Sequence, residues 1–127
     1  MSNSKVIQTE AAPAAIGPYS LAVSTGSLVF CSGQIPLDPK SMEIVEGGVE
    51  QQARQVFENL SAVATAAGAT LNDAVKLTIF LTDLGDFAVV NDIMAQYFNE
   101  PYPARATIQV SALPKGSMVE VEAILAP

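Results

Sequence analysis

Apolar residues recur at steps of three and four between residues 49 and 67, which predicts an amphipathic helix over this segment. Gly68 follows at the position where a glycine commonly ends a helix. Asp83 or Asp86 can cap a second helix over about residues 87–98. The stripe predicted to be buried on this second helix consists of Phe87, Val90, Met94 and Phe98.

Residues 74–82 alternate between apolar and polar side chains, which predicts a strand. Residues 20–25 and 28–32 predict two more strands, joined by a turn at Thr25-Gly26-Ser27. Further strands are expected near residues 6–9, 104–110 and 117–125. Five or six strands with two helices define an α+β fold, which we expect to form a single domain over residues 1–127.

Two helices can cover only one face of such a sheet. Several strands are nevertheless apolar at both alternating positions, as in Leu28-Val29-Phe30-Cys31, a pattern typical of a sheet that is buried on both sides. Only 15% of the residues are charged, which is low for a lone soluble domain. The sequence therefore predicts an oligomer whose subunits pack their sheet faces together.

The charge and the scarce residue types exclude several classes of function. The net charge is −7 and the six basic residues are dispersed, which disfavours binding of nucleic acid or phosphate. The chain has no histidine, so histidine-ligated metals and imidazole acid–base chemistry are excluded, and we expect no metal site. One cysteine, Cys31, permits no internal disulfide and is most simply a small buried residue. With no signal-peptide pattern and no membrane-spanning segment, we expect a cytoplasmic protein.

Arg105 is the strongest candidate for a binding residue. Pro101 and Pro103 restrict the backbone before it, and no acidic residue lies within four positions on either side. A guanidinium held in this way suits bidentate capture of an external carboxylate. The sequence alone slightly favours another interpretation, in which Arg105 pairs with Glu120 or Glu122 across the sheet.

The last strand places Glu120 and Glu122 on one face and Val119, Val121 and Ala123 on the other. Two carboxylates on a partly apolar face should raise the pKa of at least one of them. Such a carboxylate can orient or activate water. The alternative is that Glu122 is a solvated or interface charge.

The remaining candidate positions are compatible with ordinary structure as well as with a site. Tyr19 follows Gly17-Pro18 and could pack on the core, the turn Ser32-Gly33-Gln34 could bind nothing, and Asn91 could be polar surface. The glycines form neither a dinucleotide-binding nor a P-loop pattern.

Taken together, a series of short segments closely resembles the RidA (YjgF, reactive intermediate deaminase) family, in the family's order and over almost the whole chain. The segments are Ala15-Ile16-Gly17-Pro18-Tyr19, Ser32-Gly33-Gln34-Ile35-Pro36, Gln52-Ala53-Arg54-Gln55, Thr82-Asp83-Leu84, Asp86-Phe87, Val90-Asn91, Pro103-Ala104-Arg105, Leu113-Pro114-Lys115 and Val119-Glu120-Val121-Glu122-Ala123. Each is weak alone, but the ordered set is specific.

The resemblance implies a chorismate-mutase-like fold and a homotrimer, with the sheets forming a central barrel and with clefts between subunits. It also implies hydrolysis of the enamine and imine intermediates that pyridoxal-phosphate-dependent dehydratases release, such as 2-aminoacrylate, 2-iminopropanoate and 2-iminobutanoate. The products would be 2-keto acids and ammonia, and no cofactor would be required.

The resemblance assigns catalytic positions to Arg105, which would hold the substrate carboxylate, and to Glu120 and Tyr19, which would shape the site and hold water. Substrate-binding positions implied beside Arg105 are Gly33, Asn91 and Thr107. Many deaminase members have cysteine where this chain has Thr107, but the role there falls largely on the backbone carbonyl.

Other functions remain open at this point. Some relatives are described as ribonucleases or translation inhibitors. The negative net charge of this chain gives these activities little support. A non-catalytic sensor of 2-keto acids or amino-acid-like ligands, or a chaperone-like interaction protein, could share the fold.

Overall fold

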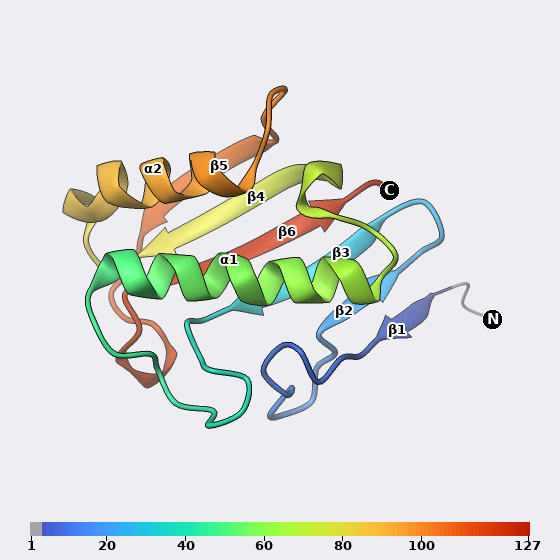
Figure 1. The fold of residues 1–127 in the computed structure, drawn as a ribbon, viewed down its shortest axis with the longest axis horizontal. Helices are drawn as coiled ribbons and strands as arrows, with labels where there is room; N and C mark the ends of the chain where they lie inside the picture. The colour runs from blue at the N-terminus through green and yellow to red at the C-terminus, as the bar shows by residue number, and fades with distance from the viewer. Residues whose placement is uncertain (1–3) are drawn as a thin grey trace.

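The computed structural model describes residues 4–127, and its centre is a mixed six-stranded sheet with two α-helices on one side (Figure 1). Along the chain the elements are β1 (Lys5–Ile7), β2 (Ala22–Ser24), β3 (Val29–Gln34), α1 (Val49–Ala66), β4 (Ala74–Leu81), α2 (Phe87–Tyr97), β5 (Ala104–Gln109) and β6 (Val119–Leu125). The strand order is β1-β2-β3-β6-β4-β5. This is the α+β sheet, with both helices on one face, that the sequence predicts.

The β4–α2–β5 unit brings Arg105 to the edge of the sheet. β4 and β5 are the parallel pair, and the other neighbouring strands are antiparallel. A parallel pair needs a crossover connection, which α2 supplies. β5 therefore lies at the sheet edge with α2 beside it (Figure 1).

The hydrophobic core lies between the helices and one face of the sheet. Leu77, Ile79 and Leu81 of β4 are at most 1% exposed, as are Val119 and Val121 of β6. They pack beneath α1, whose Val56, Phe57, Leu60 and Val63 are equally buried. Full burial of a side chain of this size stabilises the fold by about 1.5–3 kcal/mol. Within residues 4–127, no helix is both long and apolar enough to cross a bilayer.

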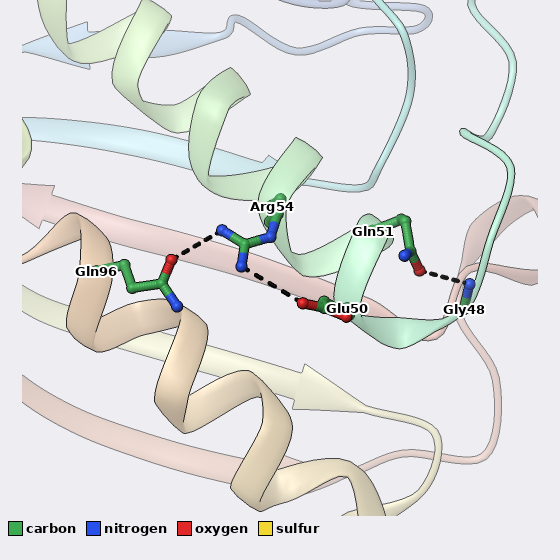
Figure 2. Close-up of polar contacts among 5 residues, drawn as sticks. All are labelled: Gly48, Glu50, Gln51, Arg54 and Gln96. Carbon is green, nitrogen blue, oxygen red and sulfur yellow. Dashed lines mark hydrogen bonds and ion pairs between the residues drawn. The ribbon is translucent and has the colours of Figure 1, made fainter.

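Polar contacts fix the two helices relative to each other (Figure 2). Arg54 of α1 donates to the Gln96 side chain of α2 at 2.9 Å and forms an ion pair with Glu50 at 3.4 Å. At the start of α1, the side-chain oxygen of Gln51 accepts the Gly48 amide at 2.9 Å. The exposed ion pair contributes at most about 1 kcal/mol, so these contacts mainly orient α2.

The prediction that Phe87 belongs to the buried stripe of α2 is wrong. It is 39% exposed, whereas Val90, Met94 and Phe98 are buried as predicted and Ile93 adds a further buried side chain. Phe87 is the first residue of α2, so its ring lies at the end of the helix, beside Arg105, rather than over the core.

The strand and cap predictions hold with small shifts. β3 runs on to Gln34 instead of ending at residue 32. Asp83 caps a short 3₁₀ turn by accepting the Gly85 amide at 2.7 Å, and Asp86 occupies the N-cap position of α2 without a side-chain bond. Gly68 follows α1 with φ +78°, as a C-terminal glycine should.

The face of the sheet opposite the helices carries exposed apolar side chains beside polar and charged ones. Val6 is 52% exposed, and Phe30 and Ile108 are each 44% exposed. A shallow hollow of about 380 Å³ on this face is lined in part by Phe30, Lys76 and Glu122. In the single chain this surface faces solvent, and its burial against another subunit stays a prediction.

Candidate active site

Arg105 projects toward α2, on the helix side of the sheet. It pairs in register with Leu77, which is fully buried beneath the helices, and paired residues on neighbouring strands share a face. Its Nη1 donates to Oδ1 of Asn91 and to Sδ of Met94, the latter at 3.6 Å. The Phe87 ring centroid lies 5.2 Å from its Cζ atom.

Arg105 has no ion-pair partner within residues 4–127. The pairing of Arg105 with Glu120 or Glu122 is therefore not the one that forms. Next to the guanidinium is a pocket of about 380 Å³, which Tyr102 and Pro103 help to line. The arginine thus presents an unneutralised positive charge at a small, partly apolar pocket.

Gly33 and Glu120 meet at an irregularity between β3 and β6. Cys31 pairs with Ala123 but Gln34 pairs with Val121, so β3 carries one extra residue at this point. A Cβ atom on Gly33 would lie 2.0 Å from Oε2 of Glu120. The Glu120 carboxyl group therefore occupies the space that any other side chain at position 33 would need. Bulges of this kind are common next to active sites, where they re-aim a side chain.

Burial raises the pKa of Glu120 above its ordinary value of 4.5, and the negative charge of Glu122 raises it further. This is the effect that the sequence predicts for at least one of the two carboxylates. Glu120 is partly buried and Glu122 is exposed, so the two are not equivalent. A carboxylate with a raised pKa is a better proton acceptor near neutral pH.

Tyr19 and Glu120 line the same pocket, which has a volume of about 790 Å³. Gly33, Met42, Pro114 and Glu122 are among its other walls. Gly17 has φ +125°, a conformation that favours glycine, and its carbonyl accepts the Tyr19 amide at 2.9 Å. This tight turn directs the half-exposed Tyr19 ring to the pocket.

The predicted site residues fall into two groups on opposite sides of the sheet. Arg105, Asn91 and Thr107 form the first group, because Thr107 pairs with the buried Ile79 just as Arg105 pairs with Leu77. Glu120 pairs with Phe80, which has the opposite alternation, and it belongs with Tyr19 and Gly33. One small ligand cannot contact Arg105 and Glu120 of the same chain at once.

Thr107 and Cys31 carry the remaining reactive side chains near these groups. The Thr107 hydroxyl is buried and has no hydrogen-bond partner in the described part of the chain. Cys31 is buried as predicted, and burial raises the pKa of its thiol to about 11, so the thiol stays protonated. Over residues 4–127, no group of three or more acidic or cysteine side chains is placed to hold a metal ion.

Sequence reasoning missed the contacts that Phe87 and Met94 make with Arg105. Both were assigned to the core because they are apolar. The available signal was their spacing from Asn91, four and three residues away, which places all three on one side of α2.

Comparisons with known proteins identify the family of the chain. The sequence profile described as Endoribonuclease L-PSP matches residues 9–126, and the chain belongs to this family, which is the RidA/YjgF family. The mouse protein named 2-iminobutanoate/2-iminopropanoate deaminase is 52% identical over 120 residues, which is 94% of this chain and 89% of the mouse protein.

Solved structures extend the likeness to the fold. The crystal structure of RidA from the Antarctic bacterium Psychrobacter sp. PAMC 21119 is 54% identical, with a TM-score of 0.94 over 97% of this chain and 99% of that one. The crystal structure of E. coli TdcF with bound serine is 44% identical, with a TM-score of 0.91 over 97% of this chain and 98% of that one.

Proposed function

We propose that this protein hydrolyses reactive enamine and imine intermediates, such as 2-aminoacrylate/2-iminopropanoate and 2-iminobutanoate, to 2-keto acids and ammonia. The observation that carries the proposal is the Arg105 guanidinium, held by neutral groups and left without an acidic partner within residues 4–127. A 2-imino acid supplies the missing carboxylate. The likeness to the mouse deaminase supports the same substrate class.

The chemistry follows from two charged groups and one water molecule. Arg105 binds the substrate carboxylate and so fixes the C=N carbon. A water molecule, held by Glu120 and by the backbone carbonyl of Thr107, attacks that carbon while Glu120 accepts a proton from it. The imine reacts in its N-protonated form, so this attack gives a neutral carbinolamine. Glu120 returns its proton to the carbinolamine nitrogen, the C–N bond breaks, and the hydroxyl group loses its proton to the leaving ammonia, which gives a 2-keto acid and ammonium. Positioning of the reactants accounts for most of the acceleration.

We propose that the complete site forms between subunits of a homotrimer, in which the open sheet faces form a central barrel. The support is the division of the site: Arg105 lies on one side of the sheet and Glu120 on the other. A neighbouring subunit can bring its Glu120 group to the Arg105 group of the first. The exposed apolar side chains on the open face, such as Phe30 and Ile108, suit burial against other copies. Sedimentation of a stable monomer at micromolar concentration would contradict this assembly.

The decisive experiment couples the purified protein to a pyridoxal-phosphate-dependent serine or threonine dehydratase and follows decay of the imine. Arg105→Ala should abolish the acceleration while the melting temperature changes little, because the exposed side chain has no ion pair to lose. Lys40→Ala is the matched control, since Lys40 is also an exposed basic residue but lines neither the Arg105 pocket nor the Glu120 pocket, so hydrolysis should stay intact. Near-normal turnover in Arg105→Ala would remove the basis of the proposal.

A second candidate is a sensor that binds 2-keto acids or amino-acid-like ligands without converting them. The bound serine in the structure of the related TdcF favours testing it. A sensor with Glu120→Gln should keep its affinity and show no catalytic change, whereas an enzyme should lose rate. An interaction protein would depend on neither Arg105 nor Glu120.

We propose a cytoplasmic location for the deaminase, where the dehydratases that form these imines would act.

A further inference from the structure

One side of α2 is occupied by the guanidinium of Arg105. Phe87, Asn91 and Met94 lie on this side at spacings of four and three residues. The Phe87 ring lies 5.2 Å from Cζ of Arg105, the Met94 sulfur accepts from Nη1 at 3.6 Å, and Oδ1 of Asn91 accepts from the same nitrogen. The arginine is thus held by three different groups from a single helix.

All three groups are uncharged, and this determines what they can do. A carboxylate partner would neutralise Arg105 and occupy one of its paired donor edges. An amide oxygen, a thioether and an aromatic face instead hold the guanidinium and leave its charge available. Phe87 takes little apolar surface away from the core by lying here, because it is at the first turn of the helix, where its side chain is 39% exposed.

The contacts also distinguish the edges of the guanidinium. Both α2 acceptors take their bonds from Nη1. The Nε and Nη2 hydrogens of Arg105 have no acceptor within residues 4–127. These two nitrogens carry parallel N–H bonds that match the two oxygens of a carboxylate.

We propose that Phe87 is a positioning residue for Arg105, and that the substrate carboxylate binds the Nε–Nη2 edge that α2 leaves open. This inference rests on the proposed deaminase function for its kinetic test, but its structural test does not depend on that function. Phe87 acts through Arg105 and touches no reacting atom.

A positioning residue for a carboxylate that stays bound throughout the reaction should change KM and leave kcat alone, since binding of ground state and transition state is weakened equally. Phe87→Leu, which removes the ring and keeps an apolar side chain, should raise KM about two- to fivefold, as expected for loss of an exposed cation–π contact. Phe87→Tyr keeps the ring and should stay within about twofold of the parent. Val89→Ala is the matched control, because Val89 is an apolar residue of α2 with a similar exposure of 40%.

Side-chain NMR tests the geometry directly. The chain contains only two arginines, Arg54 and Arg105, so the ¹⁵N spectrum has two Nε–H signals, and the Arg54→Ala variant assigns them. The ring current of Phe87 should shift the Arg105 signal upfield, and this shift should disappear in Phe87→Leu but not in Phe87→Tyr. Addition of 2-oxobutanoate, the product of 2-iminobutanoate hydrolysis and a stable analogue of that imine, should move the Arg105 Nε–H signal downfield.

Each outcome is decisive. If Phe87→Leu keeps the upfield shift and an unchanged KM, or if kcat falls as much as kcat/KM, Phe87 does not position Arg105. If 2-oxobutanoate binds but leaves the Nε–H signal unmoved, the carboxylate does not use the Nε–Nη2 edge. If the NMR results are as expected but no imine is hydrolysed, the geometry stands and the deaminase proposal fails.

Discussion

Substitution of Gly33 by alanine tests whether the position of Glu120 sets the rate. The new Cβ atom would lie 2.0 Å from Oε2, 2.9 Å from Cδ and 3.2 Å from Cγ of Glu120. Ordinary contact begins at 3.4 Å, so the carboxylate oxygen must move by about 1.4 Å. Because Glu120 is only partly buried and borders a pocket of about 790 Å³, its side chain has room to move without unfolding the sheet.

The expected result is a large loss of rate with a small loss of stability. A displacement of about 1 Å in a catalytic group can cost about 10²-fold in rate. We therefore expect Gly33→Ala to lower kcat in the coupled dehydratase assay by about that factor, and to change the free energy of unfolding by no more than about 1 kcal/mol. Gly48→Ala is the matched control, because a Cβ atom there would meet only Oε1 of Gln51 at 4.0 Å.

A double-mutant cycle makes the reasoning refutable. In an enzyme that already carries Glu120→Ala, there is no carboxylate left to displace, so adding Gly33→Ala should cost almost nothing further. If the two substitutions instead reduce the rate independently, Gly33 acts through its own backbone or through β3, and the reasoning is wrong. An unchanged rate in Gly33→Ala alone would refute it as well.

Four further predictions concern the charged and hydroxyl groups of the site. Arg105→Lys should lose most of its kcat/KM, because an ammonium cannot bind a carboxylate with two parallel bonds; this is measured in the coupled assay. Glu120→Gln should lower turnover by about 10²–10⁴-fold while Glu122→Gln stays near normal. Because its pKa is raised in the folded protein, ionised Glu120 destabilises the fold. Above the raised pKa, Glu120→Gln should therefore melt at a higher temperature than the parent protein. The two melting temperatures should converge as the pH falls below 4.5, the ordinary pKa of the carboxyl group. Thr107→Cys should keep the rate and raise the melting temperature slightly, since the buried hydroxyl lacks a partner within residues 4–127.

The parts of the fold that follow from local periodicity were predictable. The repeat of apolar residues in α1 and the alternation in β4 and β6 each record which side chains face the core, and the core in the structure is formed by those side chains. Alternation also places Glu120 and Glu122 on one face, but the difference in their burial appears only in the structure.

The division of the site could not be predicted in this way. Whether Arg105 and Glu120 share a face depends on the register of β5 against β4 and of β4 against β6, and these pairings join residues far apart in the sequence. The bulge that brings Gly33 under Glu120 is likewise a mismatch between two strands, which neither strand records alone. Phe87 was misassigned because an aromatic residue in a helical repeat has the same pattern whether it meets the core or a cation.

The placement of Arg105 and Glu120 on opposite sides of one sheet has a consequence for mixtures of defective subunits. If each site of a head-to-tail ring takes its arginine from one subunit and its glutamate from the next, Arg105→Ala and Glu120→Ala chains are complementary rather than merely inactive. In an equal, random mixture, about one interface in four would join an intact arginine to an intact glutamate. Two inactive preparations should therefore regain about a quarter of full activity after they are unfolded together and refolded. A cell that carries one copy of each mutant gene would likewise retain function.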